Sequence, residues 1–186
     1  MHHWAWNQTL EPLGIQLDWA SYQKNFVGVA DEVALDVVLR DRLRLSDRAT
    51  DREALVARKQ TLFRQGLEEA RPFLPDTVRL LEEICRVYKL AVVSSSYKSE
   101  VEPPLIRAGI RQYFQFLITG EDVQHFKPAP EPYLLAAERL GARRPLVIED
   151  SGAGVASGRA AGFEVLRVSA VGNVGREVRE RLAALP

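Results

Sequence analysis

Residues 90–96, Leu-Ala-Val-Val-Ser-Ser-Ser, decide the fold class. A continuous apolar run that stops at hydroxyl side chains is typical of a strand buried on both faces, as strands are in a parallel sheet. Similar runs predict further strands over residues 114–118, 145–148 and 163–168. Helical patterns precede, separate and follow these strands, over residues 75–88, 100–108, 130–140, 154–161 and 174–185. This alternation predicts right-handed crossovers and a parallel, doubly wound α/β sheet.

The N-terminal part of the chain shows helical periodicity instead, and we expect no strand in it. Thr50 or Asp51 can cap a helix on which Leu55, Leu62 and Leu67 share one face. The composition changes near residue 72. We therefore expect two domains, a helical one over residues 1–72 and an α/β one over residues 73–186.

The composition is that of a soluble globular protein, with 46% hydrophobic and 27% charged residues among 186. Basic and acidic residues number 25 each, so the formal net charge is zero, which argues against a nucleic-acid or membrane-surface partner. No apolar run approaches the roughly 20 residues that a membrane span needs. The single cysteine, Cys85, excludes an internal disulfide and favours a reducing compartment. Since Met1–Trp4 also lack the layout of a secretory signal, we expect a cytoplasmic protein.

Polar side chains follow three of the predicted strands. Ser94 and Ser95 follow the first strand, Lys127 lies in the segment after the second, and Glu149 and Asp150 end the third. Ligands of such sheets bind outside the carboxyl ends of the strands, so we expect these side chains to converge. Hydroxyls and an ammonium suit phosphate oxygens, and carboxylates suit Mg²⁺. Together they predict a phosphate-and-magnesium site.

Each of these residues also has a simpler interpretation. A serine run after a strand is often a loop or helix cap, and a single lysine is normally a solvated charge. However, only five of the 25 basic residues are lysines, which favours a specific need for Lys127. Glu149 and Asp150 can cap a helix, although two carboxylates are costly to bury beside an apolar strand without a cation. The histidines, His2, His3 and His125, lack metal-ligand spacing, and we interpret them as structural or surface residues.

Three segments in order resemble motifs two, three and four of the haloacid dehalogenase-like (HAD) superfamily. They are Val-Val-Ser-Ser-Ser at 92–96, Lys-Pro-Ala-Pro-Glu-Pro-Tyr at 127–133 and Val-Ile-Glu-Asp-Ser-Gly-Ala-Gly at 147–154. Their spacing is similar to that of the subgroup containing β-phosphoglucomutase and many small-molecule phosphatases. Residues 2–15 are similar to the first helices of that subgroup's cap domain, so the resemblance extends over nearly the whole chain.

The resemblance implies a Mg²⁺-dependent phosphoryl-transfer site on a HAD-like, Rossmannoid core. Ser94 would hydrogen-bond the transferring phosphoryl group, with help from the Ser95 backbone, and Lys127 would neutralise its oxygens. Asp150, together with Glu149, would hold Mg²⁺. The helical N-terminal domain would act as a cap that excludes water and selects the substrate.

One element of the family pattern is absent from the sequence. The family's chemistry uses an Asp nucleophile on a first strand and an Asp general acid two residues later. None of the nine aspartates here lies two residues from another. In the family that strand lies between the strand ending at Ser94 and the one ending at Glu149, so its absence predicts a gap of roughly 10 Å, about two strand spacings.

Three explanations of this gap stay open. The natural protein begins upstream of Met1, or the chain completes its sheet by self-association or with a second chain, or it is a degenerate family member kept for binding.

The leading functional hypothesis is a phosphatase that acts on a small phosphorylated metabolite, in particular a sugar phosphate. A phosphomutase would carry an Arg in the cap segment at residues 28–32, which has no basic residue, so we favour hydrolysis over the mutase alternative. The other alternative is a non-catalytic phosphate- or partner-binding module. Residues 152–158 approach a dinucleotide-binding fingerprint, but Glu149 and Asp150 place negative charge where a pyrophosphate would approach.

Overall fold

The structure, a computed structural model, describes residues 1–42, 51–69 and 73–184. The chain forms two compact units, Met1–Ala70 and Arg71–Pro186, and each is described by itself. In the described part of the chain, no helix combines the length and the apolar character that crossing a membrane requires.

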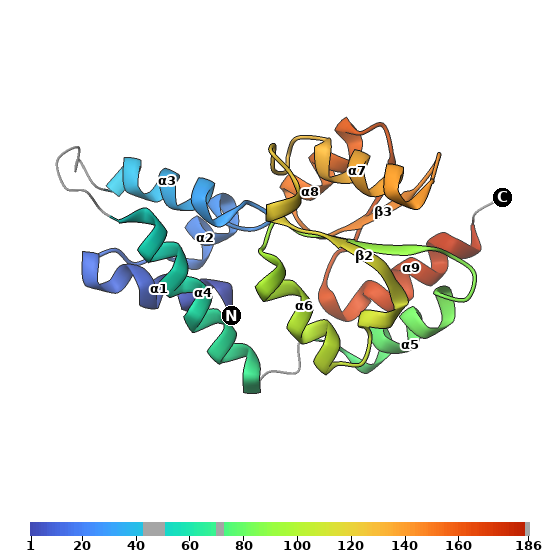
Figure 1. Ribbon diagram of the computed structural model, residues 1–186, viewed down its shortest axis with the longest axis horizontal. Helices are drawn as coiled ribbons and strands as arrows, with labels where there is room; N and C mark the ends of the chain where they lie inside the picture. Colours follow the sequence, from blue (N-terminus) through green and yellow to red (C-terminus); the bar gives the residue numbers. More distant parts are fainter. Residues whose placement is uncertain (43–50, 70–72, 185–186) are drawn as a thin grey trace. The chain divides into compact units, whose positions relative to one another are not determined.

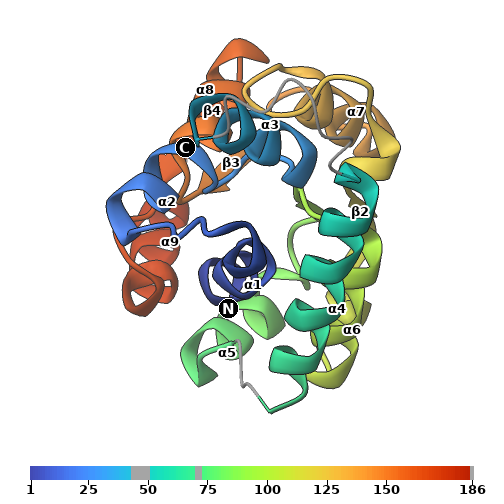
Figure 2. The ribbon, with the colours of Figure 1, turned by 90° about the vertical axis from the view of Figure 1, so that its left-hand side faces the viewer.

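The first unit is helical, and its described residues contain no strand (Figures 1 and 2). Its α-helices are α1 (His2–Leu10), α2 (Trp19–Asn25), α3 (Asp31–Arg42) and α4 (Arg52–Glu69), with the short 3₁₀ helix η1 (Glu11–Leu13) after α1. Helix α1 lies against α4, where Ala5 packs on Phe63 and Leu67. This contact gives the unit an apolar core of its own.

Helix α4 buries a face that differs from the predicted one. Of Leu55, Leu62 and Leu67, only Leu67 is buried, and the other two are half-buried. The buried stripe runs through residues 56, 59, 63 and 67, whose steps of three and four match the helical period. A lysine occupies the second of these positions, which is why a search for apolar residues missed the stripe. The predicted cap is confirmed at Asp51, whose Oδ1 accepts the Ala54 N–H at 2.9 Å, whereas Thr50 lies outside the described residues.

Lys59 is buried completely inside this helical unit. Its ammonium donates to Asp31 Oδ2 at 2.6 Å and lies 5.3 Å from the ring centre of Phe63 and 5.9 Å from that of Trp6. A charge in an apolar core is tolerated only when it is paired, and the ring faces add further attraction. The ion pair therefore ties the first residue of α3 to the middle of α4.

Asp31→Ala should destabilise the helical unit by about 3 kcal/mol, because it leaves the buried Lys59 ammonium without this carboxylate. All three tryptophans of the chain lie within residues 1–70, so tryptophan fluorescence during urea unfolding reports on this unit. The matched control is Asp36→Ala in the same helix, which removes an exposed ion pair with Arg52 and should cost less than about 1 kcal/mol. Equal losses in the two variants would contradict this account.

The second unit has the predicted parallel α/β architecture. Its strands are β1 (Leu90–Val93), β2 (Phe114–Ile118), β3 (Leu146–Glu149) and β4 (Glu164–Arg167). Its α-helices are α5 (Pro75–Ile84), α6 (Lys98–Arg107), α7 (Glu131–Leu140), α8 (Gly152–Ala160) and α9 (Val174–Ala183). Gly141, in the left-handed region at φ +65°, is the C-cap of α7. Helices α7 and α8 lie on one side of the strands, and α5, α6 and α9 lie on the other (Figure 1). The alternation of strands and helices thus produces a doubly wound unit.

The four strands form two separate two-stranded sheets. Strand β1 pairs in parallel with β2, with Val93 opposite Ile118, and β3 pairs in parallel with β4, with Glu149 opposite Arg167. In the described part of the chain no ladder joins β1 to β3, and the gap expected from the sequence falls at this place.

Strand β1 is less buried than its apolar sequence predicted. Residues 90–93 are all half-buried, and Ile148 in β3 is 41% exposed. The prediction of burial on both faces was wrong because it assumed a continuous sheet, whereas within the described residues each of these strands has a partner along one edge only.

Candidate active site

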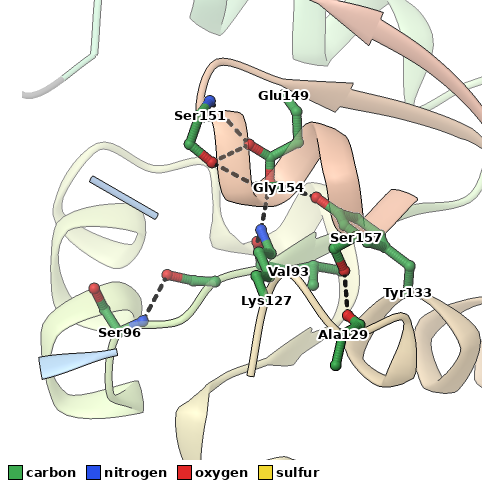
Figure 3. A network of polar contacts seen from close by, with 10 residues as sticks. Val93, Ser96, Lys127, Ala129, Tyr133, Glu149, Ser151, Gly154 and Ser157 are labelled. Carbon is green, nitrogen blue, oxygen red and sulfur yellow. Dashed lines mark hydrogen bonds and ion pairs between the residues drawn. The ribbon is translucent and has the colours of Figure 1, made fainter. Parts of the chain in front are cut away.

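The ammonium of Lys127 connects the carboxyl ends of β1 and β3 (Figure 3). It donates one hydrogen bond to the carbonyl oxygen of Val93, at 3.0 Å, and another to Glu149 Oε1. Val93 directly precedes Ser94, and Glu149 directly precedes Asp150. The structure therefore brings the three predicted segments to one place.

Lys127 is 6% exposed, so its interpretation as a solvated surface charge is wrong. The ring of Tyr133 lies 4.9 Å from its Nζ and covers part of the ammonium. A lysine ammonium has three N–H groups, and Val93 and Glu149 accept two of them. None of the described residues accepts a hydrogen bond from the third, which is therefore available to a ligand.

The carboxylate of Glu149 accepts four hydrogen bonds. Lys127 and the hydroxyl of Tyr133 donate to Oε1, and Ser151 donates its backbone N–H, at 3.3 Å, and its hydroxyl, at 3.0 Å, to Oε2. Burial acts to raise the pKa of Glu149, but the charge of Lys127 and the hydrogen bonds outweigh it, so that this pKa lies below its ordinary value. Burial and the Glu149 charge together hold the pKa of Tyr133 far above its ordinary value, so its hydroxyl remains a donor.

The start of α8 explains the glycine in the third segment. Ser151 is the N-cap of this helix, because its Oγ accepts the Gly154 N–H at 2.9 Å. Glu149 and Asp150 were alternatively interpreted as helix caps, but the N-cap of α8 is the next residue, Ser151. A Cβ on Gly154 would lie 2.0 Å from the carboxyl carbon of Glu149. Only glycine at this position lets the carboxylate reach Lys127.

The Ser94 side chain is oriented by its own loop. Its backbone N–H donates to Ile118 O at 2.9 Å, which extends the β1–β2 ladder, and its Oγ accepts the Ser96 N–H at 3.1 Å. In this bond the oxygen is an acceptor, so the hydroxyl proton remains available as a hydrogen-bond donor. Ser94 is thus arranged as a hydrogen-bond donor at the end of β1.

The loop after β2 braces the Ser94 loop. Gly120 donates its N–H to Ser96 O at 3.0 Å, and a Cβ on Gly120 would lie only 3.1 Å from the Ser95 carbonyl oxygen. Glu121 Oε2 accepts the Lys98 N–H at the start of α6, at 2.8 Å. These contacts fix the two loops to each other.

Asp150 differs from Glu149 in being exposed, and none of the described residues makes a hydrogen bond or ion pair with its carboxylate. Its oxygens suit Mg²⁺, which prefers carboxylate, phosphate and water ligands in an octahedron. The Glu149 oxygens already have donors. Within the described ranges no group of three or more His, Cys, Asp or Glu side chains is gathered for a metal. The chemistry of Asp150 fits one protein ligand of Mg²⁺, and metal binding by Asp150 and by Glu149 both stay predictions.

Sequence reasoning gave no role to Tyr133, Ser151 or Gly154. All three lie in the quoted segments, but a tyrosine at helical spacing is typical of a core position and a serine before a helix is typical of a cap. The histidines occupy structural or surface positions: His2 stacks on Phe63, His3 contacts the Leu17 carbonyl, and exposed His125 contacts Glu131.

A family model of haloacid dehalogenase-like hydrolases matches residues 4–162. The chain therefore belongs to the haloacid dehalogenase-like hydrolase family, as its three strand-end segments indicate.

Several characterised proteins are similar to this chain. It is 33% identical over 115 residues to fructose-1-phosphate phosphatase YqaB of Escherichia coli, a match that covers 58% of this chain and 61% of the relative. It is 28% identical over 144 residues to the phosphorylated carbohydrates phosphatase of Thermotoga maritima, with 76% of this chain and 65% of the relative covered. The chain thus spans less than two thirds of either relative.

Solved structures of other proteins are also similar to this one, and two of them show how far the similarity extends. CbbY from Rhodobacter sphaeroides, in complex with xylulose-1,5-bisphosphate, superposes with a TM-score of 0.77 at 26% identity, over 88% of this chain and 76% of CbbY. β-Phosphoglucomutase from Clostridium difficile superposes with a TM-score of 0.78 at 20% identity, over 98% of this chain and 91% of the mutase. The second similarity supports the fold alone.

Gly154→Ala should disrupt the candidate site, because the added methyl group displaces the Glu149 carboxylate from Lys127. We expect the free energy of unfolding to fall by about 2–4 kcal/mol, measured by urea denaturation with circular dichroism. Gly152→Ala in the same helix is the matched control, because a Cβ there meets nothing within 4 Å. The interpretation fails if both variants are equally stable.

Glu149→Gln should lower the stability of the chain by about 3 kcal/mol at pH 7, because the Lys127 ammonium loses its charged partner. The folded-state pKa of Glu149 lies below its ordinary value of 4.5. The stability that ionised Glu149 contributes is therefore complete above about pH 4.5 and is lost as the pH falls through the lower folded-state value. Urea denaturation at a series of pH values should show the free energies of unfolding of the wild type and Glu149→Gln converging in acid. A difference that stays constant with pH would refute the contribution of Glu149 ionisation to stability.

Proposed function

We propose that this protein is a Mg²⁺-dependent phosphatase of small phosphate esters, with sugar phosphates as the substrate class. The observation that carries the proposal is the position of the Lys127 ammonium, which contacts the residues directly before Ser94 and Asp150. Three groups thereby come together at the ends of two strands: the Ser94 hydroxyl as a hydrogen-bond donor, the Lys127 ammonium, and the Asp150 carboxylate as the proposed metal ligand. This set of groups suits a phosphoryl group and its metal ion.

Ser94 and Lys127 are the proposed phosphate-binding groups. The Ser94 hydroxyl has its oxygen occupied by the Ser96 N–H, and the Lys127 ammonium retains one N–H group. Both would donate to the phosphoryl oxygens, where charge develops during transfer, and the Ser95 backbone is the proposed third donor. Fixed donors of this kind need little reorganisation when the reaction occurs.

Asp150 is the proposed metal ligand contributed by the described residues. Bound Mg²⁺ would neutralise phosphoryl charge. Glu149 was expected to share the metal, but its four hydrogen bonds favour a different task, which is to hold Lys127. We therefore propose that Asp150 contributes more to metal affinity than Glu149.

Hydrolysis through a phosphorylated enzyme also needs an acceptor carboxylate, and the sequence has no Asp-X-Asp motif. We propose that this carboxylate enters on a strand that pairs between β1 and β3, which have no ladder between them in the described part of the chain. That strand would come from a segment outside the described residues or from a second chain. Without that strand, the site would bind phosphate but would not hydrolyse phosphate esters, which corresponds to the non-catalytic alternative.

The substrate class rests on the relatives. The Escherichia coli and Thermotoga maritima proteins are named as phosphatases of fructose 1-phosphate and of phosphorylated carbohydrates, and CbbY was solved with a sugar bisphosphate. The phosphomutase alternative is weaker, because the segment at residues 28–32 has no basic residue and its Asp31 is paired with Lys59.

Binding of orthophosphate in the presence of Mg²⁺, measured by calorimetry, tests the proposed site without requiring turnover. Ser94→Ala and Asp150→Asn should each weaken binding by about tenfold or more, the loss expected of one charge-assisted contact. Ser99→Ala, which removes an exposed hydroxyl on α6, should have no effect. Unchanged affinity in the first two variants would refute the site, and hydrolysis of p-nitrophenyl phosphate that survives Asp150→Ala would refute the mechanism.

A further inference from the structure

Tyr133 lies where the Lys127 ammonium meets the Glu149 carboxylate. Its hydroxyl donates to Glu149 Oε1, the same oxygen that accepts from Lys127, and its ring lies 4.9 Å from Lys127 Nζ (Figure 3). The side chain is 7% exposed. One residue therefore contacts both members of the ion pair.

The local sequence fixes the distance between Tyr133 and Lys127. Ala129 donates its N–H to Phe126 O at 2.9 Å, which turns the chain directly after Lys127, and α7 begins at Glu131. The hydroxyl of Ser157 donates to Ala129 O and ties this turn to α8. The ring and the ammonium are thus held by the same short, braced segment.

We propose that Tyr133 is a positioning residue, whose hydroxyl holds Glu149 and thereby directs the Lys127 ammonium toward the anion beside Ser94. This role rests on the proposed phosphate-binding function of Lys127. Ser151 holds the other carboxylate oxygen, so without the Tyr133 hydroxyl only Lys127 itself remains on Oε1. Glu149 Oε1 could then shift together with the Lys127 ammonium. The remaining N–H of Lys127 would no longer point in a fixed direction.

If Tyr133 only filled space in the core, its ring alone would matter and its hydroxyl would be dispensable. Tyr133→Phe keeps the ring and its contact with Lys127 and removes the hydroxyl alone. Tyr113 provides a matched control, because its hydroxyl donates to Glu82 Oε1 at 3.2 Å in the same unit, on residues outside the candidate site. Both Tyr113→Phe and Tyr133→Phe remove a Tyr–Glu hydrogen bond. Only Tyr133→Phe removes the one to Glu149, so an effect seen in that variant alone is specific to the candidate site.

The experiment measures orthophosphate affinity in the presence of Mg²⁺ and the nitrogen-15 NMR signal of the Lys127 ammonium. With five lysines in the chain, that signal can be assigned by its disappearance in Lys127→Met. Tyr133→Phe should weaken orthophosphate binding about tenfold and accelerate the exchange of the Lys127 ammonium protons with water. Tyr113→Phe should change neither quantity.

Normal affinity together with slow ammonium exchange in Tyr133→Phe would overturn the proposal. If the wild-type chain does not bind orthophosphate, the proposed function fails, and the ammonium exchange still decides whether Tyr133 holds Lys127. Should Tyr133→Phe not fold, the wild-type protein provides the test: the Tyr133 hydroxyl proton should give a slowly exchanging signal that shifts when orthophosphate is added. A signal that orthophosphate leaves unchanged would overturn the proposal.

Discussion

The hydrogen bonds of one buried ammonium connect the two halves of the α/β unit. Strands β1 and β2 form one sheet and β3 and β4 form another, and in the described residues no backbone ladder joins them. Lys127 contacts the last residue of β1 and the last residue of β3. A lysine can occupy this position because Glu149 supplies the opposite charge, and Glu149 can do so because Gly154 leaves space for its carboxylate.

The same arrangement gives the proposed site its chemistry. An apolar pair of similar volume would often stabilise a protein as well as a buried ion pair does, so stability alone is a weak reason for placing Lys127 and Glu149 here. An ammonium fixed by two acceptors, with one donor remaining, is useful for binding an anion. Under the proposed function the two adjacent carboxylates would have different tasks: Glu149 would orient Lys127, and exposed Asp150 would bind the cation.

The sequence predicted the strands well and the environment of the polar residues poorly. All four strands lie within two residues of their predicted ranges, because each apolar run ends abruptly at polar or turn residues. By contrast, the burial of Lys127 and Lys59, and the stripe that Lys59 completes on α4, depend on partners distant in sequence. Tyr133 was not recognised, because its contact with Glu149 joins residues sixteen positions apart and is specified only by the packing of α7 beside the strand ends.

The most direct test of this account is a crystal structure of the chain grown with Mg²⁺ and tungstate, a phosphate analogue that anomalous scattering locates. We expect tungstate within hydrogen-bond distance of Ser94 Oγ and Lys127 Nζ, with Lys127 still bonded to Glu149 and the cation on Asp150. Tungstate bound elsewhere on the chain, or a Lys127 side chain turned away from the ends of β1 and β3, would contradict the account.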